Sequence, residues 1–297
     1  MVNELLRTAA ESRLDYVVNG KTRHLPFMSD AEKLSLERKA EELNERKTLA
    51  IKGSSKIKVT DIKERGDFRE VQYILHEKWL IQNDDSFYLE EKIVRRLASL
   101  TDTEVLEDLA ESRPEVHQDF EAFDDEDLER KGFYYDRMAA VQYAERWWNS
   151  HNSQYKNFDV NCTNFVSQCL RSGGAQMRGY PGKGTGWWMQ NNTWSYSWAV
   201  AHSMNLFLPR SKTGLRGIKV GSAEELRPGD VVCYDFEGDG RFDHTTFVVA
   251  KDKNNMPLVN AQTSNSRMRY WSYKDSTAYT PNIRYSFYRI QDDSEKS

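Results

Sequence analysis

The sequence predicts an α+β protein with two domains and mainly antiparallel strands. Its length of 297 residues favours about two domains over one. Runs rich in β-forming residues, separated by short turns, occur in both halves, as in antiparallel sheets. Between the halves, residues 101–130 hold 13 acidic and 2 basic residues, a composition typical of an extended, solvated connector.

The first half is expected to form a small α+β module over residues 1–112, whose role the sequence does not reveal. Ser29 and Glu32 form a capping-box pattern, which predicts a helix over about residues 30–49. Strands are then predicted around three runs of β formers, at residues 57–59, 71–75 and 87–89. The intervening Asn83-Asp84-Asp85 is read as a turn.

A second capping-box pattern, from Thr101 to Glu104, predicts a short helix through Val105, Leu106 and Leu109. The acidic linker is placed at residues 113–130 and contains the run Asp124–Asp127. Two interpretations of this linker stay open. It is a plain solvated connector, or it is a tether that lies over the more basic second half and hinders its groove.

The second half is expected to fold as one domain over residues 131–290, followed by a polar tail at 291–297. Apolar residues at helical spacing between Ala140 and Trp147 predict a helix of about fifteen residues. A second helix is predicted to begin at Cys162 and to end at Gly173-Gly174 in a left-handed cap. Three later runs predict an antiparallel meander, at residues 231–234, 244–250 and 258–260.

Cys162 and His244 are the candidate reactive residues, because a thiol at a helix N-terminus is stabilised as the thiolate and an imidazole is its usual base. A core cysteine and a structural strand histidine remain the plainer alternatives. The backbone amide of Cys162 is a candidate oxyanion donor, with a second donor expected from Asn157 or Gln154. Asn260 or Gln262 on the next strand is expected to orient the imidazole.

Three separated motifs then resemble a known bacterial family, the "putative amidase domain". They are the run from Tyr135 to Ala144, the run from Cys162 to Leu170 followed by Gly173-Gly174, and the pair Gly229-Asp230 with Asp243-His244-Thr245. The resemblance covers about residues 131–290. The family looks like a branch of the papain-like cysteine peptidases and amidases, beside the CHAP-like peptidoglycan hydrolases.

This resemblance implies a papain-like, CHAP-like fold with a helix-borne cysteine on an antiparallel sheet. It makes Cys162 the nucleophile and His244 the base of an amidase or peptidase acting on peptidoglycan or a related peptide. The family often has a histidine where Gln262 stands, which leaves Asn260 or Gln262 as the third residue. The alternative is a non-catalytic module that binds cell wall or protein on the same fold.

Two further features have both a structural and a functional interpretation. Carboxylates at Asp235, Glu237, Asp239 and Asp243 have the spacing of a calcium loop, although Thr246 stands where such a loop needs glutamate. A plain connection between strands is the favoured interpretation, and no cofactor is expected to be required. The aromatic residues Trp187, Trp188 and Trp194 are either core or the wall of a substrate groove.

Composition and motif content also limit the expected partners, cofactors and location of the protein. Residues 1–130 carry 31 acidic and 21 basic side chains, and residues 131–297 carry 15 and 21. No dense basic block with interleaved aromatics indicates nucleic acid, no segment predicts a membrane span, and no ligand spacing indicates a metal enzyme. Without a conventional signal peptide, a cytoplasmic or spore-associated protein is expected, with non-standard export as the alternative. The three cysteines are expected to be reduced, and the sequence indicates no oligomeric state.

Overall fold

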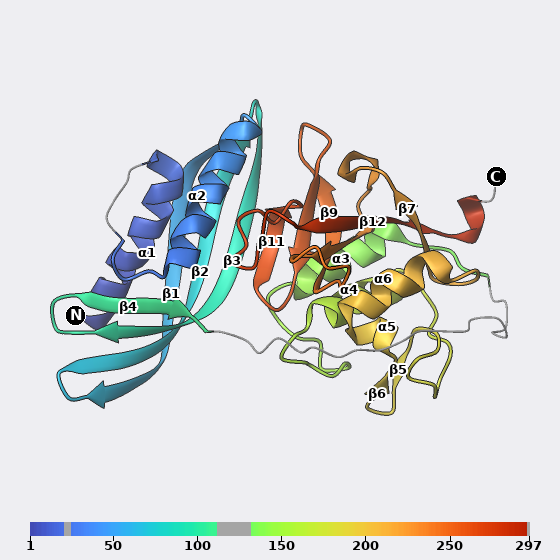
Figure 1. Cartoon of the computed structure of the whole chain (residues 1–297), viewed down its shortest axis with the longest axis horizontal. Helices are drawn as coiled ribbons and strands as arrows, with labels where there is room; N and C mark the ends of the chain where they lie inside the picture. The colour runs from blue at the N-terminus through green and yellow to red at the C-terminus, as the bar shows by residue number, and fades with distance from the viewer. Residues whose placement is uncertain (21–24, 112–131, 296–297) are drawn as a thin grey trace. The chain divides into compact units, whose positions relative to one another are not determined.

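The computed structural model describes residues 1–20, 25–111 and 132–295 (Figure 1). It is a mixed α+β structure with antiparallel strands and several helices, as predicted. Two compact units divide the chain: Met1–Arg113 with Ser264–Tyr279 form the first unit, and Pro114–Thr263 with Thr280–Ser297 form the second. The predicted acidic linker, residues 113–130, lies outside the described residues.

The sequence predicted one contiguous domain over residues 131–290, but residues 264–279 belong to the first compact unit. Residues 264–279 leave the second unit, pack within the first unit and then return. The strand in this segment, β11 (Asn265–Tyr270), pairs antiparallel with β3 through Asn265 and Ile93. Sequence periodicity could not reveal this excursion, because a short strand carries no mark of the sheet that it joins.

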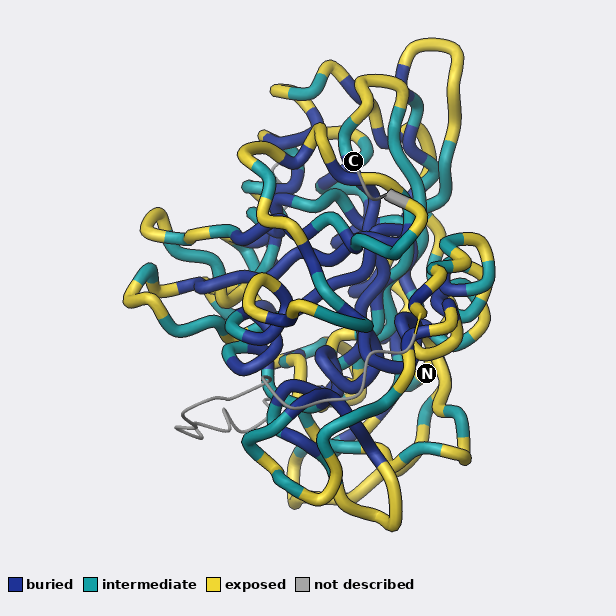
Figure 2. The backbone as a smooth tube through the Cα atoms, turned by 90° about the vertical axis from the view of Figure 1, so that its right-hand side faces the viewer, coloured by how far each residue is buried: buried dark blue, intermediate teal, exposed yellow. Residues whose placement is uncertain are grey.

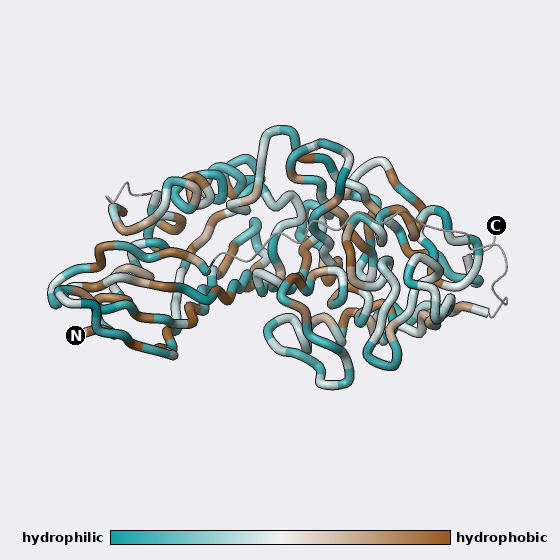
Figure 3. Tube along the Cα trace, turned by 60° about the horizontal axis from the view of Figure 1, so that its bottom comes forward, coloured by the Kyte–Doolittle hydropathy of each residue, from teal (hydrophilic) through white to brown (hydrophobic). Residues whose placement is uncertain are grey.

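The first unit is built from two helices on an antiparallel sheet with the order β1-β2-β3-β11, where β4 also pairs with β3. Hydrophobic and hydrophilic residues alternate along its long strands, seen as brown and teal in Figure 3. One face therefore meets the helices, with Leu6 and Ala10 against Tyr73 and Leu75. Its other elements are α1 (Val2–Asn19), α2 (Asp30–Glu45), β1 (Leu49–Arg65), β2 (Phe68–Asn83), β3 (Ser86–Leu100) and β4 (Val105–Ala110).

The predicted helix and three strands of this unit are present, and α1 is an additional helix that the sequence analysis missed. In α2 the Ser29 hydroxyl accepts a hydrogen bond from the Glu32 amide at 3.3 Å, which is the predicted cap. The helix ends at Glu45 rather than near residue 49, because Lys47 takes a left-handed φ of 55° ahead of β1.

The helix predicted through Val105 and Leu109 is wrong, because these residues form strand β4. The Thr101 hydroxyl accepts from the amides of Thr103 and Glu104 and so makes a tight turn. The free edge of β3 then takes the segment as a strand. Asp108 on β4 is fully buried and accepts from the side chains of three residues at 2.8 to 2.9 Å, namely Arg13, Tyr73 and Arg96.

Buried charges fix the returning segment 264–279 in the first unit. Asp275 accepts from Arg269 at 2.6 Å and from the Lys39 ammonium at 3.3 Å. Lys39 on α2 also donates to Glu90 on β3. Buried ions need partners of this kind, since an unpaired charge in the core is costly. Burial raises the pKa of the neighbouring Glu42 to about 7, an effect that Asp275 reinforces.

The second unit has a five-stranded antiparallel sheet with the order β10-β9-β8-β12-β7, and the predicted meander forms its β8-β9-β10 part. Its central strands and α4 are buried along most of their length, as the dark blue stretches of Figure 2 illustrate. The strands are β7 (Arg216–Val220), β8 (Val231–Asp235), β9 (His244–Lys251), β10 (Pro257–Ala261) and β12 (Arg284–Gln291), with a separate hairpin of β5 (Met189–Gln190) and β6 (Thr193–Trp194). The helices are α3 (Arg137–Trp147), α4 (Cys162–Ser172), α5 (Tyr196–Ala199) and α6 (Ala201–Arg210).

Two of the motifs behind the family resemblance stabilise the fold of this unit. Arg137 at the start of α3 donates to Asp230 at 2.6 Å, and the Tyr135 hydroxyl donates to the Gly229 carbonyl at 2.7 Å. Asp230 is fully buried. These contacts join α3 to the turn that feeds β8. None of the helices in the described residues combines the length and hydropathy required to cross a membrane.

Lys39→Met tests the buried charge cluster of the first unit. Because the change leaves Glu90 and Asp275 without their shared ammonium partner, the free energy of unfolding should fall by about 3–5 kcal/mol. Urea denaturation followed by circular dichroism measures this change. The control is Lys33→Met on the same helix, which removes an exposed ion pair with Asp30 and should cost about 0–1 kcal/mol. Equal small losses in both variants would contradict the assignment.

Candidate active site

Cys162 is the first residue of α4 and His244 is the first residue of β9, and these two elements pack together. Cys162 is 2% exposed and His244 is half-buried. Burial alone would raise the pKa of the thiol. The charge and hydrogen bond of His244, with hydrogen bonds from the Thr245 backbone and Thr163, outweigh burial and lower the pKa of Cys162 from 9.0 to about 6. The pair therefore has the electrostatics of a thiolate beside an imidazole.

The residues that follow the pair in sequence hold the two elements together. The Thr245 hydroxyl donates to the Thr163 hydroxyl at 3.0 Å, and both side chains are buried. The Thr163 oxygen also lies 3.7 Å from the Cys162 sulfur. This buried hydrogen bond helps to fix the start of α4 against the start of β9. The sequence analysis did not identify this pair of threonines, because neither has a recognisable motif of its own.

A network of amide side chains holds the loop that leads into Cys162. Asn161 precedes the helix but does not cap it through its side chain. Instead its Oδ1 accepts from the Phe158 amide at 3.0 Å and from Asn164 Nδ2 at 2.8 Å. Asn161 Nδ2 donates to Gln262. Because the Asn161 side chain does not accept from the first backbone amides of α4, these amides can face a developing negative charge.

Asn260 and Gln262 were the predicted orienting residues, and the structure places their amides against α3. Asn260 donates to Glu145 at 2.8 Å, and Gln262 donates to the carbonyls of Trp147 and Ser150 at 2.6 and 2.8 Å. Asn260 pairs with Phe247, three residues beyond His244, so the alternation of side chains puts Asn260 and His244 on opposite faces. These contacts assign both amides to the packing of α3 and the cysteine loop.

Aromatic rings contact the imidazole of His244. The ring of Tyr234 lies 5.6 Å from it and the ring of Phe236 lies 6.2 Å away, with an interplanar angle of 27°. His202 supports the same region from α6, since its Nδ1 accepts from the Phe242 amide at 3.3 Å. These contacts of Tyr234, Phe236 and His202 were not predicted from the sequence. The regular β8–β9 pairing that sets Tyr234 opposite His244 could have found the first.

Gln154 and Asn157, the candidate donors of a second oxyanion hydrogen bond, are both exposed in the loop before Cys162. The loop is tied to the first turn of α4, because Asn164 donates to the Lys156 carbonyl at 2.8 Å. Asn157 adjoins this tie. Gln154 lies further from the helix in sequence, and its backbone amide donates to Asn152 Oδ1 at 3.0 Å.

The tryptophans divide between core and surface. Trp187 and Trp188 are 0% and 1% exposed, which excludes them as walls of a groove and makes them core residues. Their ring N–H groups donate to Ser167 at 3.0 Å and to the Gly182 carbonyl at 3.1 Å. Trp194 remains half-buried, so among the three predicted groove residues it is the one able to meet a ligand.

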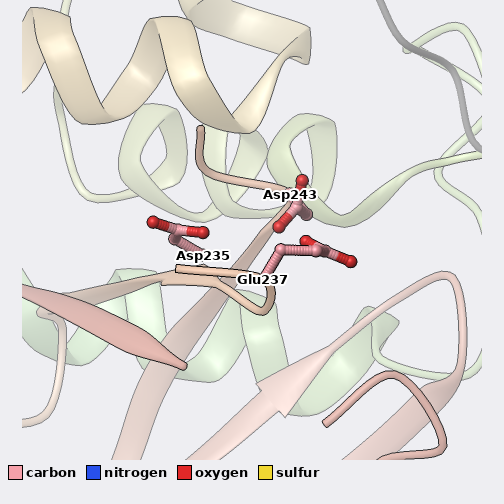
Figure 4. A group of neighbouring side chains, drawn as sticks. All are labelled: Asp235, Glu237 and Asp243. Atoms are coloured by element: carbon pink, nitrogen blue, oxygen red, sulfur yellow. The ribbon is translucent and has the colours of Figure 1, made fainter. Parts of the chain in front are cut away.

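The predicted calcium loop brings three of its four carboxylates together, those of Asp235, Glu237 and Asp243 (Figure 4). Asp239 lies outside this group. Asp235 already accepts from the amides of Gly238 and Gly240 at 2.7 and 2.8 Å, which is the chemistry of a tight turn. Burial raises the pKa of Asp243 to about 6, an effect that Glu237 reinforces. The contacts of Asp235 shape the connection that delivers His244, and the calcium interpretation of the three carboxylates stays a prediction.

Cys169 and Cys233 are free and buried, as expected of reduced core thiols, and Cys162 is also free. Burial raises the pKa of Cys169 well above its ordinary value and raises that of Cys233 as well. Of the three thiols, Cys162 is therefore the one with thiolate character near neutral pH.

The comparison with known proteins agrees with these motifs. Residues 134–288 match the family model described as "Putative amidase domain", and the chain belongs to this family. The family resemblance predicted from the sequence is thus confirmed, and the family is one named for amide hydrolysis.

Two relatives come from Bacillus subtilis strain 168. The chain is 50% identical over 302 residues to the uncharacterized protein YhbB, covering 98% of this chain and 97% of that protein. It is 30% identical over 146 residues to the uncharacterized protein YjcM, covering 45% of this chain and 32% of that protein. No solved structure matches the chain.

Alkylation by iodoacetamide tests the lowered pKa of Cys162. With a pKa of about 6, the Cys162 side chain is mostly thiolate above pH 6 and mostly thiol below it. The rate of Cys162 labelling should therefore rise with pH through an inflection near pH 6. Mass spectrometry of each cysteine peptide measures the rate. Cys169 and Cys233 are the internal controls and should react far more slowly at pH 7. Equal slow labelling of all three would contradict the assignment.

Thr245→Val tests the buried threonine pair. The change removes a donor while keeping the shape of the side chain, so the inflection of Cys162 labelling should move to higher pH and the rate at pH 6.5 should fall about fivefold. Thr48→Val is the matched control, since it removes a buried threonine hydroxyl that donates to the Leu43 carbonyl within the first unit. A control that slows labelling as much as Thr245→Val would contradict the role of the pair.

Proposed function

We propose that the second unit is a cysteine-dependent amidase or peptidase in which Cys162 is the nucleophile and His244 is the general base and acid. The lowered pKa of Cys162 beside His244 carries this proposal, because burial without such a partner raises the pKa of a thiol. The position of Cys162 at the N-terminus of α4 supports it, since the helix dipole favours an anion there. Membership of an amidase family supports amide cleavage as the reaction.

The reaction begins as His244 takes the thiol proton and the thiolate of Cys162 attacks the amide carbonyl carbon. A C–S bond forms, and the carbonyl electron pair moves to oxygen, where the Cys162 amide is placed to donate. His244 then returns its proton to the nitrogen as the C–N bond breaks, which releases an amine and leaves a thioester. Water attacks this thioester while His244 takes its proton, and the acid and the free thiolate are released.

Peptidoglycan stem peptides, or the amide that joins sugar to peptide, are the substrates that we propose. The support is the resemblance of the three motifs to the putative amidase family, which looks like a branch of the papain-like enzymes beside the CHAP-like peptidoglycan hydrolases. Asn260 and Gln262 act in this proposal as positioning residues, because their amides hold α3 and the loop before Cys162.

Digestion of purified peptidoglycan tests the proposal. The wild type should release fragments with new amine termini, and Cys162→Ala should reduce their rate of release at least about a thousandfold. Mass spectrometry of the fragments identifies the bond that is cut. Cys169→Ala, two turns further along α4, is the matched control for loss of a thiol and should retain cleavage.

Cleavage that survives in Cys162→Ala would refute the mechanism. Tight binding of intact peptidoglycan by wild type and Cys162→Ala alike, with no fragments from either protein, would favour a non-catalytic binding module instead.

A further inference from the structure

One aromatic ring at the surface of the second unit lies between cationic side chains. Lys156 Nζ is 4.5 Å and Lys183 Nζ is 5.5 Å from the ring centroid of Trp194. Phe158 meets the same ring edge to face at 4.7 Å. Trp194 is half-buried and both lysines are exposed, so this cluster faces solvent. We call these four residues the Trp194 cluster.

The Trp194 cluster is anchored next to the candidate nucleophile. The Phe158 amide donates to Asn161, and the Lys156 carbonyl accepts from Asn164, so both ends of this short segment are tied to the first turn of α4. Phe158 lies four positions before Cys162, which limits their Cα separation to about 14 Å. On the other side, the Tyr196 amide donates to the Lys183 carbonyl at 2.8 Å.

The positive charges of the cluster are unmatched within the described part of the chain. No carboxylate of the described residues forms an ion pair with Lys156 or Lys183, whose ammonium groups lie over the Trp194 ring. The two nitrogens lie at most about 10 Å apart, because they are 4.5 and 5.5 Å from the same ring centroid, and the Debye length in physiological salt is about 8 Å. Both ammonium groups therefore add to the positive potential around Trp194, and a carboxylate bound beside the ring would be attracted by each of them.

We infer that the Trp194 cluster is a substrate subsite for a carboxylate, carried by a peptide whose amide bond is presented to Cys162. The inference rests on the proposed function and adds the class of substrate, an acidic peptide. Trp194 and Phe158 provide apolar contact for the peptide chain, and Lys156 and Lys183 bind the carboxylate. Because Phe158 is tied to the first turn of α4, we place this carboxylate a few residues from the scissile bond.

Three chloroacetyl peptides test this inference without knowledge of the natural substrate. They are N-chloroacetyl-Ala-Glu amide, N-chloroacetyl-Ala-Gln amide and N-chloroacetyl-Ala-Gln free acid. In each case the Cys162 thiolate displaces chloride, so that a C–S bond forms as the C–Cl bond breaks. The first probe has a side-chain carboxylate, the third has a terminal carboxylate, and the second has neither. The concentration of each probe that gives half-maximal inactivation is measured on the full chain.

For at least one acidic probe, the concentration that gives half-maximal inactivation should be about tenfold lower than for the neutral probe. The acidic probe that shows this advantage identifies whether a side-chain or a terminal carboxylate is bound. In Lys156→Gln/Lys183→Gln this advantage should fall to about onefold. The control Lys212→Gln/Lys219→Gln removes the same charge from exposed positions near β7 and should retain the advantage. Raising the salt from about 0.05 to 0.5 M should also weaken it in the wild type.

Saturable labelling of Cys162 with equal concentrations for acidic and neutral probes would overturn the subsite while leaving the proposed function intact. An advantage that survives in Lys156→Gln/Lys183→Gln would overturn it in the same way. A failure of every probe to label Cys162 faster than Cys169 would overturn the proposed nucleophile, and the subsite with it.

Discussion

The hydrogen bond between the Thr163 and Thr245 hydroxyls is the contact on which the candidate site depends. It is buried, and each threonine directly follows one member of the candidate pair. The start of α4 and the start of β9 therefore cannot move apart without breaking a hydrogen bond in the core. A buried bond of this kind is costly to leave half made, which gives the two elements one preferred arrangement.

The rest of the second unit keeps the ends of α4 and β9 in place. Gln262 and Asn161 join the end of the meander to the loop before the helix, and Arg137 and Asp230 join α3 to the turn ahead of β8. Reactive side chains are thus supplied by element ends, where amides are unpaired, while their neighbours are fixed by buried polar contacts. This division fits an active site that needs both a favourable field and a rigid support.

Much of this arrangement was predictable from local signals. Alternating residues and turn sequences indicated the strands of both units, and a cysteine ahead of an apolar helix indicated the start of α4. What failed was set by distant contacts. Val105–Ala110 forms a strand because β3 offers an open edge, and Trp187 and Trp188 are buried where they pack against the rings of Trp198 and Tyr180. The face that Asn260 takes was also not predictable from the sequence, since strand register decides it.

The excursion of residues 264–279 also has a consequence for synthesis of the chain. The ribosome completes residues 1–113 about 150 residues before it reaches Ser264, an interval of roughly 8–30 s at ordinary elongation rates. During that interval Lys39 and Glu90 lack Asp275, and the edge of β3 that will pair with β11 is open. The first unit therefore reaches its final form only after most of the second has been made, so the two units mature together.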